Sequence, residues 1–369
     1  MNMPKEALLN QLQTQGVRLA NPEDIKMTRT GGAGPTDHKA FSFDGQTIMV
    51  PVHSQQASKS DFVLTGTRLE KDGIPLLDIT SPGSPKFYGL KTKDGIPYSH
   101  IATLHSHDVL ATTVLQNCVR YEHESTTCKF CSIGESLKSG KTIAHKTPDQ
   151  LAEVAKAAVE LDNISQMIMT TGTPATSDRG AKVLWESVTA VKAAVNIPIQ
   201  VQCEPPRDLS WLDRLKEAGA DSLGMHLEAA TERVRQQIMP SKSKVTIAEY
   251  MTAFEYAVSV FGRGNVSTYL LAGLGDTQAE ILNLAAKLIE IGVYPFVVPF
   301  VPVQGTQLEN HPTPSTEFMA GILSPLARLT VQANLDSEKG KAGCAKCGAC
   351  SSLQSYEQKI RKTLGSCTH

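Results

Sequence analysis

Cysteine is the residue type whose spacing in this chain most directly suggests chemistry. The 369 residues include eight cysteines, of which three form a C-x9-C-x2-C pattern and three form a C-x2-C-x2-C pattern near the carboxyl end. Thiolates two residues apart can turn toward one metal centre, and soft sulfur ligands select zinc, copper(I) or iron–sulfur clusters. The first group is Cys118, Cys128 and Cys131, the second is Cys344, Cys347 and Cys350, and the others are Cys203 and Cys367.

The first group supplies three ligands, whereas a closed structural zinc site takes four. Three thiolates therefore predict an iron centre with one position left open for another molecule. The alternative is a zinc site that His123, in the insert between Cys118 and Cys128, would complete as the fourth ligand.

The composition is that of an ordinary globular protein without electrostatic bias. Lysine and arginine total 36, aspartate and glutamate total 37, and 41% of the residues are hydrophobic. This balance gives no reason to expect a nucleic-acid or membrane partner. No apolar run approaches the roughly 20 residues that span a bilayer, and the amino-terminal residues lack the apolar core of a signal peptide. We therefore expect a cytoplasmic protein, in which clustered cysteines bind metal rather than form disulfides.

Short apolar segments alternate with longer amphipathic ones from about residue 100 to residue 335. The apolar segments are nearly continuous, as in strands buried on both faces of a parallel sheet, and the longer ones have helical i, i+3, i+4 spacing. The expected strands are 108–118, 165–172, 198–203, 221–228, 265–273 and 294–302. The expected helices are 148–162, 179–195, 209–219, 230–239, 247–262, 277–292 and about 315–335. Six β/α units in a row predict a parallel sheet, open or closed into a barrel.

The flanking regions differ from this central region. Residues 1–100 are rich in glycine, proline and aspartate, and residues 336–369 hold the second cysteine group and a short amphipathic helix. Three Asp-Gly pairs look like turns between short strands: Asp44-Gly45, Asp72-Gly73 and Asp94-Gly95. We predict an α/β protein with a partial (β/α)6 TIM-like barrel at 101–335. An N-terminal β appendage would occupy 1–100 and a C-terminal iron–sulfur segment 336–369.

With Phe130 directly before its last cysteine, the first group resembles the radical S-adenosylmethionine (SAM) superfamily. Most members have C-x3-C-x2-C with an aromatic residue before the third cysteine, whereas the first spacing here is nine residues. The group would follow the first barrel strand, and barrel active sites lie at the carboxyl ends of the strands. The resemblance implies that Cys118, Cys128 and Cys131 hold a [4Fe–4S] cluster whose open iron binds SAM.

Segments at later strand ends extend this resemblance. The run MTTGTP stands where the superfamily has a Gly-Gly-Glu-like segment that binds the SAM amino group, and HLE ends the fourth strand with a carboxylate. The run YLLAGLGDT resembles the segment after the fifth strand of biotin synthase relatives, and VVPFVPVQGTQL resembles their sixth strand. The resemblance implies SAM contacts from Thr171, Gly172, Thr173, Glu228, Ala272, Gly273 and Gly275.

The second cysteine group, in KAGCAKCGACSSL, resembles the tail of a radical SAM family found beside nitrilase genes in bacteria. The GGAGP segment (31–35) and QCEPP (202–206) also resemble that family. C-x2-C-x2-C is the first part of a ferredoxin-type run, which predicts a second, auxiliary [4Fe–4S] cluster, with a zinc site as the alternative. The fourth ligand would be Cys367, Cys203 or a substrate atom.

Cys203 and Arg207 follow the third strand and are the candidate catalytic residues. Cys203 would be a cluster ligand or a thiol facing the substrate, or else a buried packing residue. Arg207 suits a substrate carboxylate by bidentate pairing, or else makes a surface ion pair. His105 and His107 would lie at the amino-terminal rim of the barrel, a face associated with stability, so neither is expected to bind metal.

The resemblance implies a radical SAM enzyme that cleaves SAM reductively to a 5′-deoxyadenosyl radical and abstracts hydrogen from an unactivated C–H bond. The auxiliary cluster would serve sulfur insertion, as in biotin and lipoyl synthases. In the alternative, the enzyme rearranges or oxidises a small metabolite bound to that cluster. The expected partners are a small-molecule or carrier-bound substrate and an electron donor such as ferredoxin or flavodoxin. A zinc-dependent barrel hydrolase and a non-catalytic metal scaffold are the rival functions.

Overall fold

The centre of the molecule is a curled seven-stranded sheet, seen in a computed structural model that describes residues 3–21 and 38–365. Six strands run parallel and pair in sequence order, and β7 (Thr103–His105) is antiparallel to the first of them. The six are β8 (Val109–Thr113), β9 (Gln166–Thr170), β10 (Ile199–Gln202), β11 (Ser222–Gly224), β12 (Val266–Ala272) and β13 (Val293–Pro299). This arrangement confirms the predicted partial (β/α)6 TIM-like barrel.

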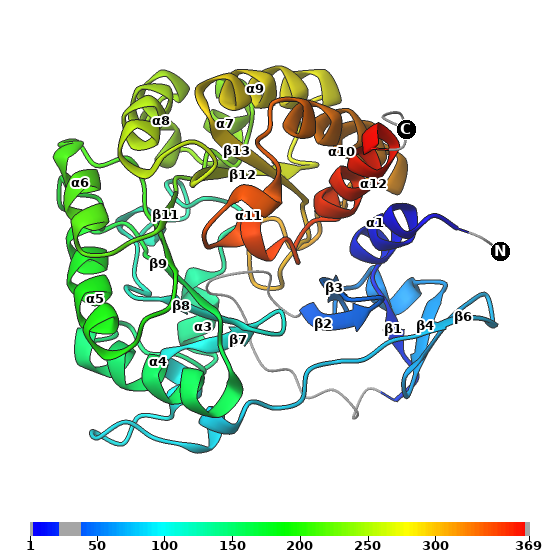
Figure 1. Cartoon of the computed structure of the whole chain (residues 1–369), viewed down its shortest axis with the longest axis horizontal. Helices are drawn as coiled ribbons and strands as arrows, with labels where there is room; N and C mark the ends of the chain where they lie inside the picture. The colour runs from blue at the N-terminus through cyan, green and yellow to red at the C-terminus, as the bar shows by residue number, and fades with distance from the viewer. Residues whose placement is uncertain (1–2, 22–37, 366–369) are drawn as a thin grey trace.

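Helices cover the outer, convex side of the sheet (Figure 1). The sequence determines where two of them begin: Thr147 and Thr277 form capping boxes with Gln150 and Glu280. The long outer helices are α4 (Pro148–Asp162), α5 (Ala181–Ala194), α6 (Ser210–Glu217), α8 (Ile247–Phe261), α9 (Gln278–Ile291) and α10 (Thr316–Gln332). Shorter helices are α2 (Tyr98–Ile101), α3 (Ile133–Lys138) and α7 (Glu232–Ile238). Within the described residues, no helix has the length and apolar character needed to cross a bilayer.

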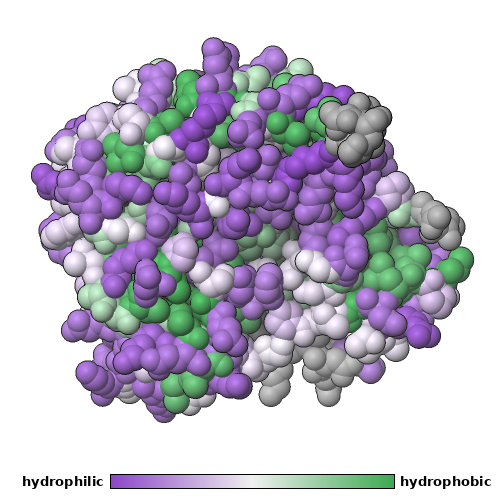
Figure 2. Space-filling model, viewed as in Figure 1, coloured by the Kyte–Doolittle hydropathy of each residue, from purple (hydrophilic) through white to green (hydrophobic). Residues whose placement is uncertain are grey.

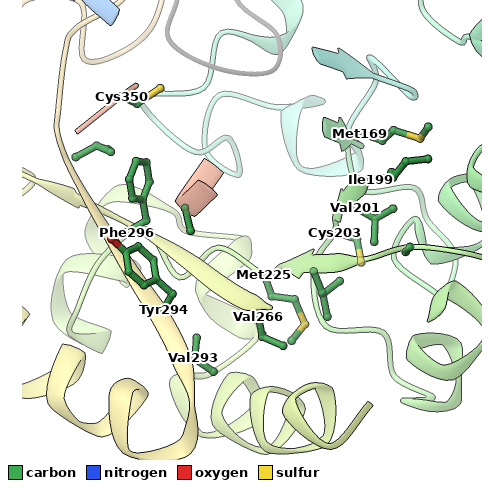
Figure 3. Close-up of a cluster of buried hydrophobic side chains, with 14 of the residues drawn as sticks. Met169, Ile199, Val201, Cys203, Met225, Val266, Val293, Tyr294, Phe296 and Cys350 are labelled. Atoms are coloured by element: carbon green, nitrogen blue, oxygen red, sulfur yellow. The ribbon is translucent and has the colours of Figure 1, made fainter. Parts of the chain in front are cut away.

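Successive side chains along each strand point to opposite faces of the sheet, so apolar and polar residues lie on different faces. Side chains on the outer face, such as Met169 and Val201, are fully buried in the main hydrophobic core between sheet and helices. Figure 3 shows part of this core along β9 to β13. Polar side chains stand on the inner face instead, among them Gln202 and His226. The interior of the curl is therefore a partly polar chamber, not a packed apolar core.

The amino-terminal region lies beside the open side of the curl (Figure 1). One sheet has the order β1 (Arg18–Leu19), β4 (Phe62–Thr65), β5 (Arg68–Lys71), β6 (Ile74–Asp78), and a hairpin joins β2 (His38–Phe43) to β3 (Gln46–Pro51). Asp44-Gly45 and Asp72-Gly73, all with positive φ angles, form two of the three expected turns between strands. Asp94-Gly95 closes only an isolated bridge between Lys91 and Pro97. Figure 2 shows a mainly hydrophilic face with hydrophobic patches, one of them on the side of this region.

The carboxyl-terminal segment enters the chamber from the amino-terminal edge of the sheet, and α11 (Cys344–Cys347) lies inside the curl (Figure 1). The backbone amide of Gly343 donates to Gln166 Oε1 at 2.7 Å, and that of Ala342 donates to Ser222 Oγ at 3.3 Å. Gln166 and Ser222 are the first residues of β9 and β11. Glycine is favoured at 343, because the backbone there has a φ of +97° and a Cβ would displace the Gln200 amide.

The last helix, α12 (Leu353–Gly365), packs against α10 and against α1 (Lys5–Gln15) and is anchored by the buried carboxyl of Glu357. Burial raises the pKa of Glu357, although four hydrogen bonds oppose that shift. The donors are the Tyr294 hydroxyl, the Thr330 hydroxyl, and the backbone amide and hydroxyl of Ser337. Glu357 therefore ties the tail helix to β13, to α10 and to the 3-10 turn Ser337–Lys339 that follows α10.

Replacement of Glu357 by alanine should lower the free energy of unfolding by about 3 kcal/mol, because it strands several buried donors. Chemical denaturation followed by circular dichroism measures the change. Glu338→Ala is the matched control, since this carboxylate is 61% exposed and its loss should cost less than about 1 kcal/mol. Equal destabilisation by the two variants would contradict the anchoring role.

Candidate active site

A cavity of about 390 Å³ occupies the chamber inside the curled sheet. Cys118, Cys128 and Cys131 line it from the loop that follows β8, at the carboxyl ends of the strands. Cys344 and Cys350 line the same cavity from the tail segment, which enters at the opposite, amino-terminal edge. Both cysteine groups singled out from the sequence therefore face one enclosed space.

Close backbone packing fixes the loop that carries the first cysteine group. A Cβ at Gly172 would lie 2.0 Å from the carbonyl oxygen of Asn117, so glycine is required for the loop to approach β9. The Gly172 amide donates to the Leu115 carbonyl at 2.8 Å, and the Val119 amide donates to the Thr173 carbonyl at 2.8 Å. Thr171, Gly172 and Thr173 line the cavity, and they also hold Cys118 in place.

The first three thiols lie near one another in a buried environment. Burial, with Cys118 and Glu228 nearby, raises the pKa of Cys131 to about 12, although a backbone hydrogen bond from Ile133 opposes the shift. Burial also raises the pKa of Cys128 well above its ordinary value. Such thiols stay neutral until a metal displaces their protons.

The donor set fits a [4Fe–4S] cluster held by three thiolates. Within the described ranges, no three cysteine, histidine or carboxylate side chains converge on a point where one metal ion could bind. A [4Fe–4S] cluster does not require this, because each thiolate binds a different iron. Phe130 lines the cavity and packs against a small buried apolar cluster that includes Val234 and Phe300. His123, the alternative ligand, is exposed and lies outside the cavity lining.

A buried ion pair between Arg120 and Glu204 lies beside the first cysteine group. Arg120 Nε donates to Glu204 Oε1 at 2.7 Å and Nη2 donates to Oε2 at 2.5 Å, a bidentate arrangement. The Thr173 hydroxyl also donates to Glu204, at 2.8 Å. Burial would raise the pKa of the Glu204 carboxyl, but these partners hold it below its usual value. Glu204 therefore remains an anion in the cavity wall.

A second buried pair joins Lys242 Nζ to Glu228 Oε2 at 2.8 Å, with both side chains less than one-fifth exposed. Burial alone would lower the pKa of Lys242, but the Glu228 carboxylate and other nearby acidic groups raise it. Glu228 has a φ of +66°, a region in which residues other than glycine are strained. The fold thus holds this carboxylate in an unfavourable backbone conformation to direct it into the cavity.

Polar groups surround the tail thiols. Gln202 Nε2 lies 3.2 Å from Cys344 Sγ, and His105 Nε2 lies 3.4 Å from Cys350 Sγ. The Tyr269 hydroxyl forms hydrogen bonds to both sulfurs, while Ser106 forms one to Cys347. Donors aimed at sulfur are the partners that metal-bound thiolates keep in proteins. Burial raises the pKa of Cys347 to about 12, so this group also needs a metal to become ionised.

His226 presents a hydrogen-bond donor to the cavity. Its Nδ1 accepts from the Tyr269 amide at 3.2 Å, so the neutral ring carries its proton on Nε2. Burial, with Lys242 nearby, lowers the pKa of His226 to about 3, so the ring is neutral. Its Nε2 is buried and has no hydrogen-bond partner among the residues the structure describes. A ligand in the cavity would find one donor there.

Of the other predicted site residues, some line the cavity and some do not. Cys203 lines the cavity, and burial raises its pKa to about 12. Arg207 is exposed and outside the lining, so the geometry does not support the expected substrate contact. The glycine segment after β12 also lies outside the lining: Ala272, Gly273 and Gly275. Cys367 and the GGAGP segment (31–35) fall outside the described residues.

Sequence reasoning missed several cavity residues because no motif marks them. Arg120 lies inside the cysteine insert and Lys242 in a 3-10 turn (Lys242–Lys244) between helices. Tyr269 and Gln202 lie within strands that otherwise read as buried and apolar. The one available signal was the alternation of Gln200 and Gln202 along β10. A strand buried against apolar residues on both faces would be apolar throughout, so these glutamines indicate a polar inner face.

Comparison with known proteins agrees with this geometry. Residues 119–288 match the radical SAM superfamily. These residues therefore form a radical SAM domain. The family implies a SAM cosubstrate and a [4Fe–4S] cluster, which the three cysteines after β8 fit.

Two curated relatives of this radical SAM chain have different activities. The chain is 25% identical over 224 residues to bacteriochlorophyllide c C-7(1)-hydroxylase of Chlorobaculum limnaeum, covering 56% of each chain. It is 28% identical over 217 residues to the dual-specificity RNA methyltransferase RlmN of Rhodospirillum rubrum, covering 53% of this chain and 48% of that protein. The chain thus spans about half the length of the curated relatives it matches.

Among solved structures, the radical SAM chain is similar to methylornithine synthase (PylB), with a TM-score of 0.48 and 16% identity over 74% of this chain and 78% of that one. A radical SAM methyltransferase from Sphaerobacter thermophilus gives a TM-score of 0.45 at 19% identity, over 71% of this chain and 75% of that one.

Replacement of Lys242 by methionine should destabilise the protein by about 3–5 kcal/mol, because it leaves Glu228 buried without its cation. The double variant Lys242→Met/Glu228→Gln should recover most of this loss. Thermal and urea unfolding measure both changes. Lys182→Met removes an exposed ion pair with Glu186 and should cost at most about 1 kcal/mol. If the double variant is no more stable than Lys242→Met, the pair is not the source of the effect.

Proposed function

We propose that this protein is a radical SAM enzyme that abstracts hydrogen from a substrate held between two iron–sulfur clusters. Cys118, Cys128 and Cys131 would hold the SAM-binding [4Fe–4S] cluster, and Cys344, Cys347 and Cys350 would hold an auxiliary one. The observation that carries the proposal is the single cavity with both cysteine groups in its walls, at opposite ends of the barrel strands.

The bound cofactors supply the radical: one electron breaks the C5′–S bond of SAM, leaving methionine and a 5′-deoxyadenosyl radical. The protein's own residues bind, orient and shield. Glu228 and the Thr171–Thr173 segment are positioned to contact SAM, because they line the cavity at the strand ends nearest the first cysteines. Phe130 and Leu271 add apolar surface to the cavity lining in that region. The cavity walls limit the contact of a bound substrate with water, which protects a reactive intermediate from side reactions.

Support for the auxiliary cluster comes from the surroundings of the tail thiols. They are buried, and each sulfur has at least one polar neighbour. These neighbours are Gln202, Tyr269, Ser106 and His105. The tail is short and depends on the barrel for its hydrogen bonds. A structural zinc ion is the alternative occupant of these thiolates.

We infer from the cavity lining that the substrate is an organic molecule with few polar groups. Its lining is mainly apolar, and His226 Nε2–H is an available donor. Sulfur insertion remains the finer proposal for the auxiliary cluster, because a sulfur donor must face the substrate across from the radical source. The hydroxylase and methyltransferase relatives do not point to that reaction, and substrate binding by the cluster is the alternative role. A ferredoxin or flavodoxin is the proposed electron donor.

Replacing Cys118, Cys128 and Cys131 together with alanine should abolish reductive cleavage of SAM, because no open iron remains to bind it. Production of 5′-deoxyadenosine under dithionite, measured by chromatography, tests this. The iron content should fall by about four atoms per chain. Glu122→Ala, an exposed position in the same loop, should cleave SAM normally. Continued 5′-deoxyadenosine production by the triple variant would overturn the assignment.

Replacing Cys344, Cys347 and Cys350 together with alanine should leave about four irons per chain and preserve SAM cleavage. The tail should become sensitive to protease beyond about residue 336, since metal binding contributes to its order. Limited proteolysis and iron analysis provide the readouts. Lys346→Ala is the control, because this side chain lies between the cysteines but is exposed. Full iron content in the triple variant, or zinc in the unaltered tail, would refute the auxiliary cluster.

A further inference from the structure

The polar inner face of β10 holds a hydrogen-bond donor against the tail cysteines. We propose that Gln202 donates from Nε2 to the Cys344 thiolate, together with the Tyr269 hydroxyl, and that these bonds raise the reduction potential of the auxiliary cluster. This inference rests on the proposed auxiliary cluster. It gives Gln202 and Tyr269 a role in tuning that cluster, while the cysteines bind the irons.

Hydrogen bonds fix the orientation of the Gln200 side chain. The backbone amide of Cys344 can only donate, and it donates to a terminal atom of Gln200 at 3.1 Å. That atom must therefore be the carbonyl oxygen Oε1. The other terminal atom is then the amide nitrogen, which donates to Ser267 Oγ at 3.2 Å. Gln200 is buried, so solvent does not compete for these bonds.

The orientation of Gln200 in turn fixes that of Gln202. A terminal atom of Gln202 lies 2.7 Å from Gln200 Oε1. Two amide oxygens cannot share a hydrogen bond, so this atom is the nitrogen Nε2, which carries two hydrogens. One hydrogen is used by Gln200 Oε1, and the other is directed at Cys344 Sγ, 3.2 Å away. The donor to the sulfur is thus set by a chain of bonds that begins at the backbone of the same cysteine.

Two further groups contact the tail sulfurs in the same way. The Tyr269 hydroxyl donates to both Cys344 and Cys350. His105 Nε2 lies 3.4 Å from Cys350 Sγ. A metal-bound thiolate has no hydrogen to give, so the imidazole would donate to it. Cys344 and Cys350 would therefore each accept two hydrogen bonds from side chains when they hold the cluster.

Such donors affect the two redox states of a cluster unequally. Reduction adds a negative charge to a centre whose ligands are already anionic, and the burial of Cys350 and Gln202 makes the added charge costly. A hydrogen bond strengthens as its acceptor becomes more negative, so each donor stabilises the reduced state more than the oxidised one. Hydrogen bonds to cluster sulfurs are among the factors that set the reduction potential. The auxiliary cluster would thus accept an electron more readily than in an apolar pocket.

A contact with substrate is the competing role for Gln202, because its side chain also lines the cavity. Both hydrogens of its Nε2 are already directed at Gln200 Oε1 and Cys344 Sγ. A substrate oxygen would have to displace one of these acceptors. His226 Nε2, by contrast, has no hydrogen-bond partner among the residues that the structure describes. The donor offered to a substrate is therefore His226, and the Gln202 donor serves the sulfur.

The test measures the midpoint potential of the tail cluster by a redox titration followed by electron paramagnetic resonance. The full chain carrying Cys118→Ala, Cys128→Ala and Cys131→Ala is reconstituted with iron and sulfide, so that only the tail cluster contributes a signal. Adding Gln202→Met keeps a side chain of similar length without the donor and should shift the potential to a more negative value. Tyr269→Phe should shift it in the same direction, and both together should shift it further.

Gln13→Met is the matched control. Gln13 Nε2 donates to the Ala349 carbonyl of the same tail at 3.0 Å, so the variant loses a buried amide bond to the backbone instead of to a sulfur. Its midpoint potential should equal that of the parent chain. A merely structural role of Gln202 would lower the stability of Gln202→Met and leave the potential of its cluster where it was.

The outcomes separate this inference from the proposed function. If the tail holds about four irons and the potential of Gln202→Met is unchanged or higher, the inference is wrong and the auxiliary cluster still stands. An equal negative shift in Gln13→Met overturns it as well. If the tail binds no iron, the auxiliary cluster and the tuning role fail together. Tyr269→Phe keeps the ring and removes only the donor, so it applies the same test if Gln202→Met assembles no cluster.

Discussion

The structure depends on hydrogen bonds between the polar inner face of the sheet and the backbone of the tail. Gln166, Gln200 and Ser222 accept from the amides of Gly343, Cys344 and Ala342. Buried polar groups need such partners, so a barrel with glutamines on its inner face is complete only when the tail is inserted. The same bonds hold the second cysteine group inside the chamber, and they determine where the cavity ends.

The carboxyl-terminal end of the chamber is organised by charge instead. Arg120 pairs with Glu204 and Lys242 pairs with Glu228, and all four groups line the cavity near the first cysteines. Each anion is balanced by a cation, so this end offers paired polar groups at low net charge. A charged cosubstrate such as SAM meets donors and acceptors already held in place, which lowers the reorganisation needed on binding.

Much of the fold could be predicted from the sequence, because its strands and helices are specified by patterns of residues close together in the chain. The six strands and their helices follow from apolar periodicity and from caps such as Thr147 before Pro148. The first cysteine group could be placed because loops after barrel strands share one edge. Lys242, by contrast, reaches Glu228 only through the fold, and His105 was placed at the rim with no sign that the tail would meet it. Such contacts join residues far apart in the chain, which no local pattern encodes.

The Ala349 carbonyl accepts from Gln13, a residue 336 positions earlier in the chain. Contacts between residues so far apart in the chain form slowly compared with local elements, because the entropy of closing a long loop opposes them. The surface of α1 and β3 that contacts the tail is therefore completed only after the barrel has formed. Until the tail docks against the amino-terminal region, its cysteines are more accessible than they are in the folded chain, and this docking ends that access.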